Sequence, residues 1–295
     1  MNIVITGASG LIGTALSSAL RADGHQVYGM QRSPSSDAPF HWWPPAGHIH
    51  FDDSIPVDVV INLAGAGIAD RRWNERRKQE IRDSRVLSTE LLAKTLSRLP
   101  HRPGLFISGS AIGFYGDTGA ERVDEMNEAG SDFLAEVSYA WEQAAKPALD
   151  AGIRTVLIRT GIVLSDRGGA LQKMLLPFKL GVGGVVGSGQ QYMSWVSLRD
   201  VVAMIRFLMA HEELSGPVNL VAPTAVTNRE FTRTLGSALK RPALLPMPAF
   251  AARLAFGEMA DQLLLSSIRV YPYLLQQAGY RFQDGDLETA LANII

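Results

Sequence analysis

The feature that most constrains the fold lies at the start of the chain, MNIVITGASGLIG. A β-branched run over residues 2–6 leads into a turn in which Gly7, Gly10 and Gly13 have GxxGxxG spacing, and a helical pattern follows. Glycines at this spacing allow a tight turn and let a pyrophosphate approach the free N–H groups of a helix N-terminus. The stretch therefore predicts a dinucleotide-binding strand, turn and helix. The turn residues that we expect to contact the dinucleotide are Gly7, Ser9, Gly10, Leu11, Ile12 and Gly13.

The rest of the first half alternates short apolar runs with helical stretches. We expect strands over 2–6, 26–31, 57–63, 104–109 and 154–160, and helices around 11–23, 74–98 and 132–151. Strands rich in Val and Ile that are separated by helices are typical of a parallel sheet with helices on both faces. The sequence therefore predicts an α/β fold, a Rossmann-like doubly wound parallel sheet.

The second half has a different texture. A glycine-rich stretch at 180–191 ends the alternation, and a helix over 198–213 and a strand over 216–223 follow. Thr227 and Glu230 have the spacing of a capping box at the start of a further helix. We expect a dinucleotide-binding Rossmann domain over 1–164 and a smaller C-terminal α+β substrate lobe over 165–295, with strand contributions that can cross the boundary.

Composition excludes several classes of function. A net charge of −1 gives no field that attracts nucleic acid or an anionic membrane. The absence of cysteine excludes disulfides, thiolate metal sites and a cysteine nucleophile, and no apolar run approaches the roughly 20 residues of a membrane span. His48, His50 and Asp52 lack a fourth ligand at suitable spacing, so we expect no metal. We expect a cytoplasmic protein whose partner is a small-molecule substrate rather than nucleic acid or a membrane; a homodimer is left open.

The ends of the second and third expected strands indicate which cofactor binds. Gln31 and Arg32 stand where an acidic residue would select NAD. An arginine can pair a 2′-phosphate through its planar fork, which favours NADP(H), although it could also be a surface arginine that contacts nothing. Leu63, Ala64 and Gly65 end the next strand with small residues that let a cofactor lie across the sheet edge.

A resemblance to a known family rests on the stretches TGASGLIG, INLAG, SGSAIGFYG and RTGIVL. They resemble the extended short-chain dehydrogenase/reductases, also called the NAD-dependent epimerase/dehydratase family. The stretches AGIADRRWNERRKQEIRDSRVLST and AGYRFQDGDLETAL are similar to an atypical branch labelled "epimerase family protein" or nucleoside-diphosphate-sugar epimerase-like. The matching stretches cover nearly the whole length.

The resemblance implies proton chemistry by a Ser or Thr, a Tyr and a Lys. Ser110 falls in the serine position, on what we expect to be a loop after a strand; Ser108 could serve instead, or Ser110 could cap local backbone.

The Tyr–Lys pair does not carry over to this chain. If Glu142 is the glutamate that follows the lysine in the family, Leu134 and Ser138 fill the tyrosine and lysine positions. If Tyr139 is the tyrosine, the lysine position holds Gln143. Lys146 is about two helical turns from Tyr139, roughly 10 Å of rise, so it does not restore the pair.

The resemblance also assigns two further cofactor contacts. Arg85 occupies the place of an asparagine that lies close to the cofactor, where it could contact NADP phosphates or form an ion pair. Val163, with Ile162, is expected to form the backbone wall against the nicotinamide.

The function that we expect is an NADP(H)-binding oxidoreductase or epimerase-like enzyme that acts on a carbonyl or hydroxyl substrate held near Ser110. With the Tyr–Lys pair degenerate, Tyr115 is the nearest acid or base, although it could also be an aromatic plug under the loop. The alternative is a non-catalytic NADP(H)-binding sensor or interaction protein.

Overall fold

A six-stranded parallel sheet forms the centre of the molecule. The computed structural model describes residues 1–33, 35 and 37–295. Every neighbouring pair of the sheet is parallel, which confirms the expected fold class. The strands lie in the order β13 (Gly216–Leu220), β9 (Arg154–Thr160), β7 (Leu105–Ala111), β6 (Val59–Asn62), β1 (Asn2–Thr6) and β2 (Gln26–Gly29).

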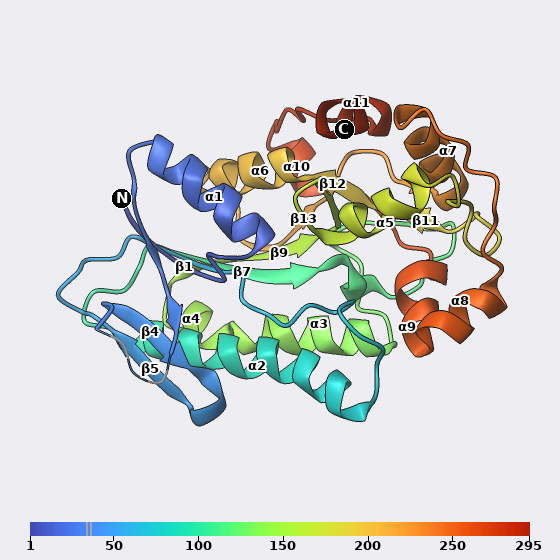
Figure 1. Ribbon diagram of the computed structural model, residues 1–295. Helices are drawn as coiled ribbons and strands as arrows, with labels where there is room; N and C mark the ends of the chain where they lie inside the picture. Colours follow the sequence, from blue (N-terminus) through green and yellow to red (C-terminus); the bar gives the residue numbers. More distant parts are fainter. Residues whose placement is uncertain (34, 36) are drawn as a thin grey trace.

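Helices cover both faces of this sheet (Figure 1). Helices α1 (Leu11–Ala22) and α6 (Leu198–Ala210) lie on one face, and α2 (Glu75–Arg98), α3 (Phe133–Ala144) and α4 (Lys146–Asp150) lie on the other. Successive strand side chains point to opposite faces, so β1 places Ile3 and Ile5 in the core under α1 and α6, and Val4 in the core under α2 and α4. The strands are therefore buried on both faces, as the apolar runs predict.

The expected helix over 132–151 is two helices. They separate at Ala145, and Pro147 lies in the first turn of α4. Proline has no backbone N–H and cannot continue the hydrogen-bond ladder of α3, whereas it is tolerated in the first turn of a new helix.

The strand order places a topological switch point between β1 and β6. The chain leaves β1 for β2 on one side and later returns to β6 on the other. The expected strand over 26–31 divides at Met30, whose side chain packs in the core with Phe40 and Trp42. The chain there leaves the central sheet for a small sheet of β3 (Gln31–Arg32), β4 (Phe40–Trp43) and β5 (His48–Phe51). Ligands bind beyond the carboxyl ends of strands at such a switch point.

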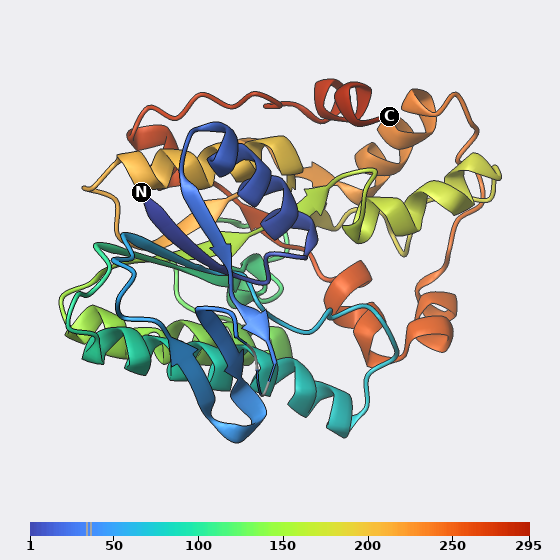
Figure 2. The ribbon, with the colours of Figure 1, turned by 60° about the vertical axis from the view of Figure 1, so that its left-hand side comes forward.

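A second core lies beyond the carboxyl ends of β7 and β9 (Figures 1 and 2). It is built around buried side chains that include Leu171, Trp195, Phe231 and Leu291. Thr227 and Glu230 form the expected capping box.

The remaining elements lie outside the central sheet, its covering helices and the small sheet of β3 to β5. They are η1 (Pro44–Ala46), η2 (Ile112–Tyr115), β8 (Arg122–Val123), β10 (Ile162–Leu164), α5 (Gly169–Lys179), β11 (Tyr192–Met193), β12 (Trp195–Ser197), β14 (Val226–Thr227), α7 (Asn228–Ala238), α8 (Ala249–Phe256), α9 (Glu258–Ala260), the π-helix η3 (Asp261–Leu265), β15 (Arg269–Val270), α10 (Tyr273–Gln277) and α11 (Leu287–Ile294).

The chain crosses the expected boundary at residue 164 more than once. Strand β13 pairs with β9 in the central sheet, and α6 packs with α1 over the same face. The division into 1–164 and 165–295 stays a prediction. Strand β13 and helix α6, although they follow residue 164, pack with the Rossmann domain. In the described part of the chain, no helix has the length and apolar character needed to cross a membrane.

Candidate active site

The three glycines of the first turn have different structural reasons. Gly7 has a φ of +67°, and a Cβ there would lie 2.8 Å from the carbonyl oxygen of Leu63. A Cβ on Gly13 would lie 2.2 Å from the carbonyl oxygen of Gly7. Gly10 has a φ of −76°, and a Cβ on it would meet one described atom, the Gly7 oxygen at 3.2 Å. The fold requires glycine at 7 and 13, whereas the open side of Gly10 leaves space for a ligand.

The N-terminus of α1 at this turn is free to bind an anion. Gly10 is the N-cap and has no side chain that could cap the helix; the first turn contains no acidic residue, and among the described residues no side chain bonds its N–H groups. The first N–H groups of a helix have no partner within the helix, and the helix dipole adds partial positive charge at this end. Leu11 reaches the loop before α5, where a Cβ on Gly168 or Gly169 would lie 3.4 Å from it, and the carbonyl oxygen of Val163 adjoins Gly169. The structure thus brings the predicted Leu11 and Val163 to one place.

A buried polar cluster fixes the end of β6 beside the glycine turn. The Thr6 hydroxyl donates to Asn62 Oδ1 at 2.6 Å and accepts from the N–H groups of Leu63 and Ala64 at 3.1 and 3.2 Å. Asn62 in turn donates to Thr89 at 2.8 Å. The predicted residues Leu63 and Ala64 are therefore held against Gly7. Asn62 itself was not predicted, although a buried amide at a strand end is a signal that the sequence carries.

Arg32 lies on the other side of β1, on β3. The residue is exposed, and its guanidinium lies 5.5 Å from the ring centroid of Trp43. Gln31 is also exposed. The carboxyl ends of three neighbouring strands therefore lead to the predicted residues: β2 leads to Arg32, β1 to the glycine turn and β6 to Leu63–Gly65. A dinucleotide spans such a sheet edge.

Ser110 lies inside strand β7 and not on a loop after it. The strand continues to Ala111 because it pairs with β9, with Ser110 opposite Arg159. The buried Ser110 hydroxyl donates to Glu142 Oε1 at 2.6 Å. Arg159 donates to both oxygens of Glu142, from Nε at 2.8 Å and from Nη2 at 2.9 Å. A buried, bidentate Arg–Glu pair therefore sets the orientation of the serine hydroxyl.

Tyr115 joins the same network from the other side. Its hydroxyl donates to Asn219 Oδ1 at 2.8 Å and accepts from Arg159 Nη1 at 3.0 Å. The Arg159 guanidinium also lies 3.4 Å from the ring centroid of Phe114. Burial raises the pKa of Tyr115 to about 12. The two predicted catalytic residues are thus connected through Arg159, which was not predicted and whose signal is a charge within an apolar strand.

The residues of the two possible Tyr–Lys registers lie along α3 and α4. Leu134 and the Ser138 hydroxyl both face Gly113, where a Cβ would lie 3.3 and 3.8 Å from them. Tyr139 is 50% exposed. Lys146 lies on α4 and pairs with Asp150 at 2.7 Å. Leu134 and Ser138 therefore face η2 at the end of β7. Tyr139 and Lys146 do not form a pair, because Tyr139 is exposed on α3 and Lys146 pairs with Asp150 on α4.

Arg85 lies on α2 at the carboxyl end of β6. A Cβ on Gly65 would be 3.3 Å from its Cζ, and its guanidinium lies 5.1 Å from the ring centroid of Trp141 on α3. Burial, and then the charge of Arg77, lower the pKa of Arg85 to about 10. Trp141 donates to Thr89 at 2.9 Å, so Arg85 adjoins the cluster that fixes β6.

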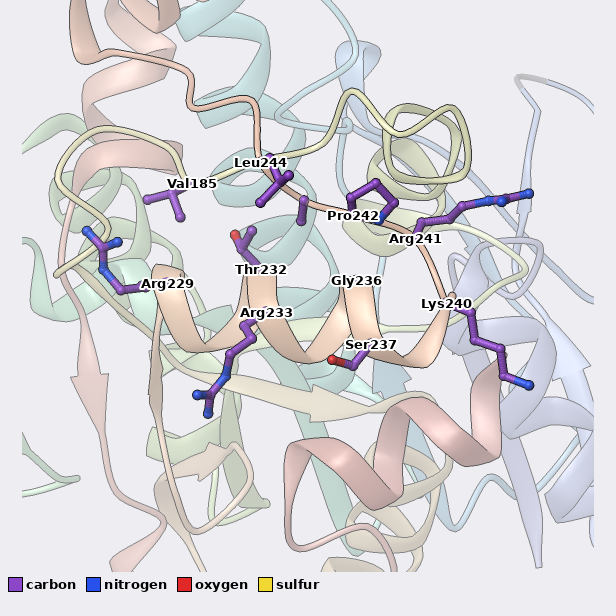
Figure 3. Close-up of a pocket in the computed structure, with 11 residues that line it drawn as sticks. Val185, Arg229, Thr232, Arg233, Gly236, Ser237, Lys240, Arg241, Pro242 and Leu244 are labelled. Carbon is purple, nitrogen blue, oxygen red and sulfur yellow. The ribbon is translucent and has the colours of Figure 1, made fainter.

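A separate hollow of about 460 Å³ lies between α7 and residues 240–244 (Figure 3). Arg229, Arg233, Lys240 and Arg241 border it, but their side chains extend away from one another. Arg229 donates to the carbonyl oxygen of Ser188 at 2.9 Å. The hollow therefore presents no converging polar groups. Across the described residues, no group of three or more His, Cys, Asp or Glu side chains could hold a metal ion.

Two family profiles match the sequence. Residues 3–221 match the NAD dependent epimerase/dehydratase family. Residues 247–294, which include α8 to α11, match a domain of unknown function, DUF1731.

Relatives and solved structures extend the match to the whole chain. The epimerase family protein Mb2239 of Mycobacterium bovis is 45% identical, over 98% of this chain and 96% of its own. The Homo sapiens epimerase family protein SDR39U1 is 35% identical over all of both chains. A crystal structure of human SDR39U1 (isoform 2) with NADPH superimposes with a TM-score of 0.91, at 34% identity, over 100% of this chain and 99% of that one. The chain belongs to the NAD dependent epimerase/dehydratase family.

Proposed function

We propose that this protein is an NADP(H)-binding oxidoreductase or epimerase-like enzyme that acts on a carbonyl or hydroxyl compound. The observation that carries the proposal is the open side of Gly10 at the uncapped N-terminus of α1. A tight turn with space left at a free helix N-terminus suits a pyrophosphate. The NADPH in the crystal structure of human SDR39U1 supports the same cofactor here.

Each part of a dinucleotide has residues that suit it. The first N–H groups of α1, from Leu11 to Gly13, suit the pyrophosphate, and Ser9 is exposed beside them. The exposed Arg32 suits a 2′-phosphate, because a guanidinium binds phosphate through two parallel hydrogen bonds. Residues Leu63–Gly65 and Val163 border the path towards Ser110. When bound, NADP(H) supplies or accepts the hydride.

Ser110 is the residue that we assign to the substrate oxygen. Its hydroxyl proton is directed at Glu142, which leaves the serine oxygen as an acceptor for a substrate hydroxyl group. For a carbonyl substrate, the Ser110 hydroxyl would rotate from Glu142 and donate a hydrogen bond to the carbonyl oxygen instead, and the proton that completes the alcohol would come from water. Glu142 and Arg159 act as positioning residues in both cases, because they orient the serine without facing the substrate themselves.

For Tyr115, the geometry favours a positioning role over acid–base work. Its proton is already donated to Asn219, and a pKa raised to about 12 makes the tyrosinate unfavourable near neutral pH. The hydroxyl also supports Arg159 at 3.0 Å.

A second function is favoured by the side chains near α3, where a proton donor would be needed. Neither register of α3 provides a Tyr–Lys pair, since one register holds Leu134 and Ser138 and the other holds Tyr139 and Gln143. The hydroxyl of Tyr115 is engaged with Asn219. A protein with a complete cofactor site and without a proton donor would bind NADP(H) and report its status, or serve as an interaction protein, without turnover.

Oxidation of NADPH in the presence of a panel of aldehydes and ketones separates these functions. For the enzyme, Ser110→Ala is expected to lower kcat on the order of 100-fold while NADPH affinity stays unchanged, because the serine contacts the substrate oxygen. Ser18→Ala, an exposed serine on α1, is the matched control. Tight NADPH binding with no turnover on any carbonyl would support the sensor, and failure to bind NADPH would contradict both.

A further inference from the structure

Arg85 carries a guanidinium whose donors are mostly unused. Nη1 donates to the carbonyl oxygen of Ile81 in its own helix at 3.0 Å. A guanidinium has five N–H donors, and the others have no partner among the residues that the structure describes. Arg85 is half-buried, so its guanidinium is not fully enclosed by the described residues.

The charge of Arg85 is also uncompensated. Within residues 1–33, 35 and 37–295, no carboxylate lies within ion-pair distance of it. Arg77, about two turns earlier on α2, has Glu80 at 2.8 Å and Asp70 at 3.8 Å. A partly desolvated cation without a partner destabilises the folded protein, and a bound anion would remove that penalty.

The position of Arg85 separates it from the expected phosphate sites of the cofactor. Helix α1, which offers its N-terminus to the pyrophosphate, covers one face of the sheet, while α2 and α3, which carry Arg85 and Trp141, cover the other. Arg32 lies beyond β1 on the far side. Strand β6, at whose end Arg85 lies, is the neighbour of β7, which carries Ser110.

We propose that Arg85 binds the acidic group of the substrate, so that the substrate is a small carbonyl or hydroxyl compound that carries a carboxylate or a phosphate. This assignment rests on the proposed function, because it places the acid group beside the carbon whose oxygen Ser110 holds. The flat guanidinium, packed against Gly65 and the Trp141 ring, presents its free edge for two parallel hydrogen bonds to such an oxyanion.

Tryptophan fluorescence gives a direct test, because Trp141 lies against the guanidinium. The protein saturated with NADP⁺ is titrated with inorganic phosphate and, separately, with benzoate, at an ionic strength held constant with NaCl. The wild type is expected to give a saturable response to at least one of the two anions. The response should weaken about tenfold or more in Arg85→Met and stay unchanged in Arg233→Met, which removes an exposed arginine on α7. Absence of a saturable response in the wild type would overturn the proposal.

Two further measurements separate this role from a cofactor contact and from a structural one. The Kd for NADPH of Arg85→Met should stay within about threefold of the wild type, and a tenfold rise with an unchanged anion response would assign the arginine to the cofactor and overturn the proposal. The ligand-free Tm of Arg85→Met should equal or exceed that of the wild type, because methionine keeps the apolar stem over Trp141 and removes an unpaired charge. A clearly lower Tm would indicate a structural role instead.

Turnover then distinguishes failure of this proposal from failure of the proposed function. With NADPH, 4-carboxybenzaldehyde should be preferred to benzaldehyde in kcat/KM by about tenfold or more, and the preference should disappear in Arg85→Met. Equal turnover of both aldehydes would contradict the acidic substrate. No turnover of either, with the anion response intact, would support the anion site and count against the enzyme.

Discussion

The two ends of the candidate site, at the N-terminus of α1 and at α3, differ in which features of the family they hold. At the α1 end, a glycine turn, an uncapped helix N-terminus and the small residues after β6 are all in place. At the α3 end, neither register of the helix provides a Tyr–Lys pair, and a buried Glu142–Arg159 pair holds Ser110. Backbone geometry is sufficient to bind a dinucleotide, whereas proton transfer needs particular side chains. The binding half of such a site can therefore persist while the chemical half changes.

The α3 end should be the more sensitive of the two to a single substitution. Glu142→Leu leaves the Arg159 guanidinium, whose side chain is 4% exposed, without a carboxylate. We expect the free energy of unfolding to fall by about 3–5 kcal/mol, as measured by urea denaturation. The double variant Glu142→Leu/Arg159→Leu should regain much of this loss, because no charge is then left unpaired.

A surface ion pair on the next helix is the control for this substitution. Asp150→Ala removes the partner of Lys146, and both side chains are more than half exposed, so the change should stay below about 1 kcal/mol. If Glu142→Leu lowered the free energy of unfolding as little as Asp150→Ala, the buried Glu142–Arg159 pair would not stabilise the α3 end of the site.

At the α1 end, two glycines should give different results. Gly13→Ala brings a Cβ to 2.2 Å from the Gly7 oxygen and 2.8 Å from the Ala8 Cα, both backbone atoms. It should lower the free energy of unfolding by about 1–3 kcal/mol. Gly10→Ala should lower the Tm less than Gly13→Ala, because its Cβ meets one backbone atom at 3.2 Å. It should weaken NADPH binding about tenfold or more, because its methyl group occupies the ligand space. Thermal melts and fluorescence titration measure both, and wild-type affinity in Gly10→Ala would contradict the proposed phosphate site.

Local signals predicted most of the fold. The strands at 2–6 and 154–160 agree with β1 and β9 residue for residue, since β-branched residues bounded by turn residues are strong strand signals. The helix expected at 132–151 divides because one proline overrides a continuous apolar pattern. Strand β13, which lies within the range expected for the lobe, joins the central sheet instead. Periodicity cannot indicate this, because it carries no information on strand order.

The candidate site was predictable only in part, for a related reason. The glycine turn is contiguous in sequence, so its spacing is visible. The network of Ser110, Tyr115, Glu142, Arg159 and Asn219 comes from four separate segments, 105–115, α3, β9 and β13, that the topology brings together. From the sequence, Arg159 is part of an expected strand, and Glu142 only marks a possible register of the Tyr–Lys positions on the helix. A charge in an apolar strand and a glutamate on a buried helix face are signals that can be paired only once the sheet order is known.

Selection of NADP(H) over NAD(H) by Arg32 on β3 is tested most directly by the affinities for NADPH and NADH. Fluorescence titration of the wild type should give a Kd for NADPH at least about tenfold lower than that for NADH, because Arg32 can pair a 2′-phosphate. Arg32→Ala should bring the two values together, whereas Arg98→Ala, at an exposed arginine in the last turn of α2, should leave the ratio unchanged. Equal affinities for NADPH and NADH in the wild type would contradict the account.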